Sequence, residues 1–252
     1  LKADEQIPNR GYWVHVHPVV RHVTPPLGFD ATLGFPGEGP EGSLPQPPTR
    51  PRAGQPLTLG TANTGGQKAI SAGKVPLHLA HFWGLQEHRL RDPESIARAA
   101  AATRRQGWSC YYTAASGGGP STDLPWSGGV AGFWVPELGL RAQPEIVVPG
   151  RVLYIHLAAR PALGIYVVYG HANQGNKQHP SEESREANRR LLHVWLSHAR
   201  SMRIPFIAIG DFNTAPTDMQ EMITDPGLLI ATPDTYTFHK GNNYNTLDYA
   251  IL

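Results

Sequence analysis

The 252-residue chain has only one cysteine, Cys110, and contains no apolar run long enough to span a membrane. A single cysteine excludes an internal disulfide framework and favours a reducing compartment over secretion. The chain begins with Leu1, and no charged segment followed by an apolar one, the pattern of a secretory signal, comes after it. We therefore expect an intracellular location, the nucleus included.

A strong charge of either sign is also lacking, because 22 Lys and Arg residues face 20 Asp and Glu residues. A net charge of +2 does not create the global basic field that by itself indicates nucleic-acid binding. Seventeen of the 22 basic residues are nevertheless arginine, which suits phosphate recognition. They gather at Arg89 and Arg91, at Arg98, Arg104 and Arg105, and at Arg185, Arg189 and Arg190. Such groups can equally form solvated helix faces.

The first 56 residues are rich in proline and glycine and contain a GFPGEGPEG run. Such a segment cannot bury enough apolar surface to become ordered, so we expect an irregular N-terminal extension with one short strand at 12–16. Residues 57–252 are long enough for one large domain. Because the chain ends inside the apolar stretch TLDYAIL, we expect this domain to be truncated at its C-terminus and its last strand to lack a covering neighbour.

Strand and helix patterns alternate along residues 57–252. Asp92, Pro93 and Glu94 predict a helix start, and Gly107 a helix end. An amphipathic pattern predicts a second, long helix from Ser181. Strands are expected at 57–63, 79–86, 108–114, 129–135, 151–158, 164–170, 204–210, 235–238 and 246–252, and helices at 92–106, 181–203 and 217–224.

The stretch IPFIAIGDFN is a buried-strand pattern that stops at a glycine followed by a carboxylate and an amide. If the strand ends in a crevice, Asp211 and Asn213 project into it from one face of an extended segment, while Phe212 turns back to the core. Gly, Asp and Asn are also turn formers, so a simple strand-ending turn is the alternative.

Six motifs occur in a recognisable order: LTLGTANTGGQ, FWGLQEH, SGGVAGF, VVYGHAN, IAIGDFN and YTFHKGNNYNTLDYAIL. Together they resemble the endonuclease/exonuclease/phosphatase superfamily, and the resemblance covers about residues 57–252. It implies an α+β fold, a two-sheet α/β sandwich. It also implies a metal site at Glu87 and Asn63, for Mg²⁺ or Mn²⁺, since Mg²⁺ is usually held by one or two carboxylates. The alternatives are an ion pair of Glu87 with Arg89 and a strand-end turn at Asn63.

The resemblance also assigns catalytic roles. Asp211 would orient or deprotonate the attacking water, and Asn213 would donate to the phosphoryl oxygens or position Asp211. Tyr169 and His171, taken to share one face of their strand, both fit the position that contacts phosphate, and Tyr169 could instead be a core aromatic. Asp248 resembles the carboxylate that orients a terminal histidine.

Two departures from the family pattern matter. Gly65 stands where some relatives carry a further acidic ligand, which leaves Glu87 as the main one. The terminal histidine normally follows the LDY motif, but the chain stops four residues after Asp248. His239 precedes Asp248 on a different segment, so we do not assign it this role.

The resemblance is strongest to the endonuclease domains of non-LTR retrotransposons and to AP endonucleases. It predicts a Mg²⁺-dependent phosphodiester hydrolase that acts on DNA or another nucleic acid, within a longer polyprotein that carries a reverse transcriptase. One alternative is a phosphatase or esterase that acts on an inositol phosphate or phospholipid headgroup. Another is a catalytically decayed binding module that lacks the terminal histidine.

Overall fold

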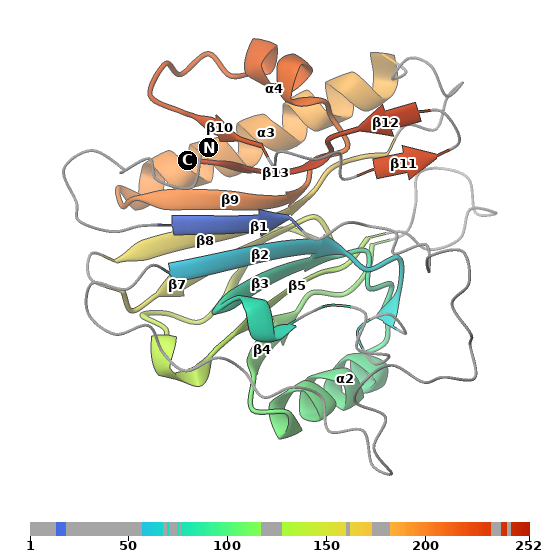
Figure 1. The fold of residues 1–252 in the computed structure, drawn as a ribbon, viewed down its shortest axis with the longest axis vertical. Coiled ribbons are helices and arrows are strands. Elements are labelled where there is room, and N and C mark those ends of the chain that lie inside the picture. Colours follow the sequence, from blue (N-terminus) through green and yellow to red (C-terminus); the bar gives the residue numbers. More distant parts are fainter. Residues whose placement is uncertain are drawn as a thin grey trace.

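The computed structural model describes residues 14–18, 57–67, 70, 75, 77–116, 128–159, 162–172, 182–232, 238–240 and 243–252, with backbone alone at 14–18, 238–240 and 243–245. Within these ranges the chain forms four layers (Figure 1). Helices α3 and α4 cover one face of a six-stranded sheet, a five-stranded sheet packs on its other face, and α2 lies outside the second sheet. The predicted α+β two-sheet sandwich is confirmed. None of the helices in these ranges combines the length and apolar character that a membrane span requires.

The five-stranded sheet has the order β1-β2-β3-β5-β4, and β1, β2 and β3 run parallel. Its strands are β1 (Val14–Pro18), β2 (Leu57–Asn63), β3 (Phe82–Gln86), β4 (Ser109–Tyr112) and β5 (Val130–Trp134). The short N-terminal strand therefore lies two residues later than expected and pairs with β2. The expected strand at 79–86 begins only at β3, because a 3-10 turn, η1 (Leu77–Leu79), precedes it.

The six-stranded sheet has the order β10-β13-β9-β8-β7-β6, with β8 and β9 as its only parallel pair. Its strands are β6 (Glu145–Val148), β7 (Val152–Leu157), β8 (Leu163–Tyr169), β9 (Phe206–Asp211), β10 (Ile230–Ala231) and β13 (Asp248–Ile251). The expectation that the last strand lacks a neighbour is wrong, because β13 lies between β9 and β10 and its residues are buried. The short strand β6 was not expected.

The helices follow their sequence signals closely. Helix α2 (Pro93–Arg105) begins after Asp92, whose carboxylate accepts a hydrogen bond from the Ser95 N–H at 2.7 Å. The other helices are α3 (Glu182–Met202), α4 (Pro216–Met222) and the 3-10 turn η2 (Pro136–Leu138). Ser181 and residues 235–237 lie outside the described residues, and β11 (Phe238–Lys240) pairs with β12 (Asn243–Asn245). The predicted apolar face of α3 is buried at Leu191, Trp195, Leu196 and Ala199.

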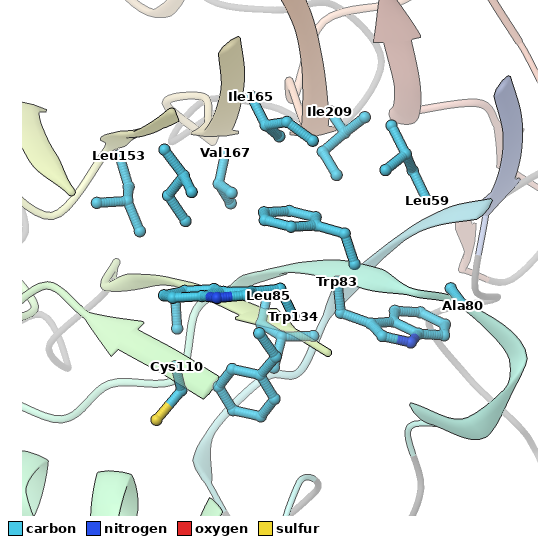
Figure 2. Close-up of a cluster of buried hydrophobic side chains, with 14 of the residues drawn as sticks. Leu59, Ala80, Trp83, Leu85, Cys110, Trp134, Leu153, Ile165, Val167 and Ile209 are labelled. Carbon is cyan, nitrogen blue, oxygen red and sulfur yellow. The ribbon is translucent and has the colours of Figure 1, made fainter. Parts of the chain in front are cut away.

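The main core lies between the two sheets. In Figure 2 the side chains of Leu153, Ile165, Val167 and Ile209 point from the six-stranded sheet toward Leu85 and Trp134 of the other sheet. A second core fills the space between the six-stranded sheet and α3. Both faces of the six-stranded sheet are therefore covered by apolar side chains. The burial of each large apolar side chain stabilises the fold by about 1.5–3 kcal/mol. Polar residues on this sheet therefore need partners inside the protein.

Candidate active site

Three residues taken from separate motifs lie in one row across the ends of β8, β9 and β13. Tyr169 is the register partner of Asp211, and Asp211 is the register partner of Asp248. Partners in register direct their side chains to the same face of a sheet. All three are buried, with Tyr169 3% and both aspartates 0% exposed. The structure thus brings these three predicted site residues together.

Asn63, the last residue of β2, connects this row to the other sheet. Its Nδ2 donates to Asp211 Oδ2 at 2.7 Å, and its Oδ1 accepts the Gly65 N–H at 3.0 Å. Asn63 is in register with Gln86 at the end of β3, so Glu87 follows one residue beyond the neighbouring parallel strand. The two residues predicted to hold a metal ion therefore lie at the same end of the five-stranded sheet, where Asn63 contacts the carboxylate row.

We had expected Asp211 and Asn213 to lie along one extended segment. Asn213 instead reaches Asp211 through a turn. Its φ of 50° is in the left-handed region, which is uncommon for a residue other than glycine. The turn lets the Asn213 N–H donate to Asp211 Oδ1 at 3.1 Å, and Nδ2 donate to Gly170 O at 3.0 Å and to Asp211 Oδ2 at 3.3 Å. Phe212 turns back to the core, as predicted, and there it stacks on Tyr249 with ring centroids 4.4 Å apart.

Glu87 lies in a strained segment of backbone. Glu87 and Arg89 have φ values of 60° and 62°, and their side chains form an ion pair. A left-handed conformation at such residues costs on the order of 1–3 kcal/mol and is enriched at functional sites. The Glu87 side chain is 17% exposed and that of Arg89 is 45% exposed. The ion pair considered as an alternative to metal binding is therefore present, on the solvent side of Glu87.

Arg151 belongs to this site although it was not among the residues predicted from the sequence. It follows a β-turn in which the Arg151 N–H donates to Val148 O at 3.0 Å, with Pro149 and Gly150 as the central residues. Gly150 has a φ of 65°, which the third position of a type II turn requires. The Pro-Gly pair before a strand was the signal available in the sequence, but it says nothing about where the next side chain points.

The Arg151 side chain is buried against Tyr169. Its Cζ lies 4.7 Å from the centroid of the Tyr169 ring, and its Nη1 donates to Gly170 O at 3.0 Å. Burial lowers the pKa of the Arg151 guanidinium, while the nearby Tyr169 and Glu87 oppose this shift. The guanidinium stays charged even so, because arginine is too basic to lose its proton in a protein. The site therefore contains a fixed, buried positive charge close to the predicted metal ligand.

Gly170, the residue after β8, packs directly against the backbone of Phe212, the residue after β9. A Cβ at Gly170 would lie 1.9 Å from Phe212 O, so no other residue fits without moving the backbone. The Gly170 N–H donates to Asp211 O at 2.7 Å, and the Gly170 carbonyl accepts from both Arg151 and Asn213. The glycine thus joins the cation to the Asp211 turn.

We had expected His171 to share one strand face with Tyr169. This is wrong, because β8 ends at Tyr169 and His171 lies beyond it. Its backbone is held by Asn188, whose Oδ1 accepts the His171 N–H at 2.6 Å and whose Nδ2 donates to His171 O at 3.1 Å. Burial, followed by the charges of Arg151 and Arg190, lowers the pKa of His171 to about 4. At neutral pH this imidazole is therefore neutral, which does not suit a positively charged phosphate contact.

The donor chemistry of this edge fits a hard divalent cation. Glu87, Asp211 and Asp248 offer carboxylate oxygens, and Asn63 an amide oxygen, which are the ligand types that Mg²⁺ and Mn²⁺ prefer. Among the described residues, no group of three or more His, Cys, Asp or Glu side chains is arranged to hold a metal ion. Mg²⁺ usually keeps several waters beside one or two carboxylates, so Glu87 with Asn63 would be sufficient to hold it.

Comparisons with known proteins agree with this architecture. No protein-family model matches the chain, and no curated protein matches it in sequence. Solved structures do match. A 3'-5' exonuclease from Neisseria meningitidis is 18% identical with a TM-score of 0.53, and the match covers 77% of this chain and 85% of that one. The APE2 catalytic domain from Xenopus laevis is 16% identical with a TM-score of 0.52, over 76% of this chain and 80% of that one.

An AP endonuclease from Leishmania major is 17% identical with a TM-score of 0.50, over 76% of this chain and 77% of that one. At such low identity these likenesses concern the fold alone. They agree with the two packed sheets of this chain. The chain has the endonuclease/exonuclease/phosphatase fold, which confirms at the level of the fold the resemblance seen in its motifs.

Proposed function

We propose that this domain hydrolyses phosphodiester bonds in nucleic acid, with DNA as the substrate and Mg²⁺ or Mn²⁺ as the cofactor. The observation that carries the proposal is the row of Tyr169, Asp211 and Asp248, tied to Asn63 by a 2.7 Å hydrogen bond at the edge where Glu87 emerges. A structural neighbour, a 3' phosphatase from Neisseria, was solved with a product DNA hairpin, which supports nucleic acid as the substrate class.

Asp211 is the residue best placed to orient and deprotonate the attacking water. Its two oxygens accept hydrogen bonds from Asn63 Nδ2, the Asn213 N–H and Asn213 Nδ2. Hydrogen bonds from such donors favour the ionised form of a carboxylate and fix its orientation. A general base needs both properties, because proton transfer depends on geometry as well as on protonation state.

The contacts of Asn213 favour one of its two expected roles. Both N–H bonds of its side-chain amide are engaged, one by Gly170 O and one by Asp211 Oδ2. Direct donation to a phosphoryl oxygen would require the amide to give up one of these bonds. We therefore assign Asn213 to positioning Asp211. Tyr169 remains a candidate for a phosphate contact, and so does His171 as a neutral hydrogen-bonding group.

The residues that would hold the metal ion are Glu87 and Asn63. A bound divalent cation would act as a Lewis acid and neutralise charge on the phosphate. Arg89 contacts Oε1 of the Glu87 carboxylate, so a metal ion bound at that oxygen would replace an ion pair. Because Arg89 is on the solvent side, this exchange requires no change in the core. Asp248 lies opposite Asp211, the place from which a carboxylate could orient a histidine.

The motif order supports a finer assignment, an endonuclease domain of the non-LTR retrotransposon type within a longer polyprotein that carries a reverse transcriptase. A nicking assay on supercoiled plasmid tests the broader proposal. We expect nicked circles with Mg²⁺ or Mn²⁺, none with excess EDTA, and a cleavage rate that falls steeply with salt, as phosphate-backbone binding requires.

Two results would redirect the proposal. Hydrolysis of a soluble inositol phosphate or a phospholipid headgroup with little salt dependence, and without nicking, would assign the site to that substrate class. A folded chain that cleaves neither DNA nor RNA with either metal ion would instead indicate a binding module. Asp211→Asn, tested in parallel, shows whether any observed cleavage belongs to this site and not to a contaminating nuclease.

A further inference from the structure

We propose that Arg151 is a positioning residue for the hydrolytic reaction, which fixes the Tyr169 ring and, through the Gly170 carbonyl, the Asn213–Asp211 pair. This inference rests on the proposed hydrolysis, because it assigns a role within that same site. Arg151 is 8% exposed, and the mechanism outlined above does not otherwise use it.

The backbone fixes where the Arg151 side chain begins. The Arg151 N–H is bonded to Val148 O across the Pro149–Gly150 turn, and the Arg151 carbonyl accepts the Tyr169 N–H at 2.8 Å. Arg151 and Tyr169 are thus joined through main chain as well as through the guanidinium and the ring. The turn holds the N–H of Arg151 and the end of β8 holds its carbonyl, so the Cα of Arg151 has little freedom to move.

The guanidinium then reaches Asp211 in three steps. Arg151 Nη1 and Asn213 Nδ2 both donate to Gly170 O at 3.0 Å, which fills the two lone pairs of that carbonyl. Asn213 Nδ2 also donates to Asp211 Oδ2 at 3.3 Å. If Arg151 is lost, the carbonyl keeps only Asn213 and can rotate, which shifts the amide and the carboxylate together. A misplacement of about 1 Å can cost roughly 100-fold in rate.

Only arginine combines the contacts seen at this position. Its planar guanidinium lies over the Tyr169 ring and at the same time donates in its own plane to Gly170 O. A lysine ammonium is a compact point charge without that fork, so it could keep the charge near Glu87 but not both contacts. A comparison of Arg151→Lys with Arg151→Met therefore separates the geometry of the group from its charge.

The experiment measures kcat and KM for plasmid or oligonucleotide cleavage by wild type, Arg151→Lys and Arg151→Met. We expect kcat to fall about 30-fold to 100-fold in both variants, with KM within about threefold, because ground-state binding does not depend on the Asp211 orientation. The matched control is Arg200→Met, since Arg200 is on α3 and pairs with Asp225 at 3.2 Å, outside the site. It should retain wild-type kcat.

The decisive measurement is a double-mutant cycle with Asn213→Ala. If Arg151 acts through Asn213, Arg151→Lys should reduce kcat by less than about twofold once Asn213 is already alanine. Losses that multiply in the double variant would overturn the inference, and so would a wild-type kcat in either single variant. A folded wild type that cleaves no substrate would overturn the proposed function itself, whereas multiplying losses in an active enzyme overturn only the role of Arg151. Urea unfolding midpoints of all variants show that each is folded.

Discussion

The six-stranded sheet has a polar cluster on each face, and the two clusters differ in how they are built. The inner cluster lies at the strand ends between the two sheets and consists of Asn63, Arg151, Tyr169, Asp211, Asn213 and Asp248. The outer cluster is Glu145, Tyr166 and His198, under helix α3: the Tyr166 hydroxyl is 2.7 Å from His198 Nδ1, and His198 Nε2 is 3.3 Å from Glu145 Oε1. Both clusters contain hydrogen bonds. Only the inner cluster has two aspartates opposite each other on neighbouring strands and a residue other than glycine with positive φ.

In the inner cluster, Asp211 is directly opposite Asp248, an arrangement that destabilises a sheet when both are charged. Asn213 in this cluster has a positive φ, and so does Glu87, the residue that follows β3. In the outer cluster, the rings of Tyr166 and His198 both contact the neighbouring Tyr154, with centroid distances of 4.9 Å and 5.2 Å. Strain and like charges cost stability, so they persist where a function requires them. We infer that the inner cluster serves chemistry and the outer cluster serves packing of α3.

The sharpest test of this difference is Asp211→Asn. We expect kcat to fall about 1,000-fold, because removing a positioned base commonly costs two to four orders of magnitude. Stability should change little, because the removal of one of two facing carboxylates is offset by the loss of at least one hydrogen bond, since an amide nitrogen cannot accept where a carboxylate oxygen did. Cleavage rates and urea midpoints are measured on the same preparations. Near-parental turnover, or a large loss of stability, would contradict the assignment of the inner cluster to chemistry.

A second test concerns the metal ligand. Glu87→Gln should reduce cleavage about 100-fold and weaken Mn²⁺ binding in calorimetry, because the only charged ligand at that position is removed. Arg89→Gln is the matched control: it removes the ion-pair partner and leaves the ligand, so Mn²⁺ should bind at least as tightly as in wild type. Mn²⁺ affinity that is equal in wild type and Glu87→Gln would refute this ligand.

Local sequence patterns predicted the elements that carry the inner cluster but not how they meet. The IAIGDFN strand, the Asp92 helix start and the burial of Phe212 follow from local chemistry, and the structure has all three. Asp211 and Asn63 were recognised one motif at a time. Their 2.7 Å contact is made between residues 148 positions apart, which no local pattern specifies.

The features that were missed depend on tertiary structure. Arg151 is an ordinary strand-start arginine in sequence, and its role arises only because Tyr169 and Gly170 lie beside it. The left-handed turn at Asn213 is set by its bonds to Gly170 and Asp211, so the extended geometry expected there was wrong. The coverage of β13 by β10 likewise depends on a two-residue strand too short to show a pattern.

The outer cluster should respond in the opposite way to the inner one. Tyr166→Phe removes the hydroxyl that contacts His198 and leaves the buried ring in place. We expect the free energy of unfolding to drop by about 1–2 kcal/mol, the usual cost of leaving a polar partner unsatisfied, with kcat unchanged. Urea unfolding and cleavage assays measure the two quantities. A loss of kcat without a loss of stability would show that the outer cluster also serves the reaction.

The smallest expected effect uses pH to separate the clusters. The pKa of His171, next to the inner cluster, is lowered from 6.5 to about 4 by burial and by Arg151 and Arg190. Between these two values the unfolded chain binds a proton that the folded chain does not. The folded protein is therefore not destabilised by His171 above pH 6.5, and it loses stability as the pH falls from 6.5 toward 4. If His171 were fully buried, the free energy of unfolding would fall by roughly 2 kcal/mol between pH 7 and pH 5. Because the side chain is partly exposed, we expect a fall of about 1 kcal/mol.

His171→Asn should accordingly lose less stability than wild type when urea midpoints are compared at pH 7 and pH 5. The matched control is His193→Asn, because that exposed imidazole lies on α3 and outside both clusters. Its midpoint should fall with pH in parallel with wild type. If His171→Asn and wild type also fell in parallel, the imidazole would be titrating normally in the folded chain. The cationic environment that Arg151 and Arg190 create around His171 would then have to be weaker than the structure indicates.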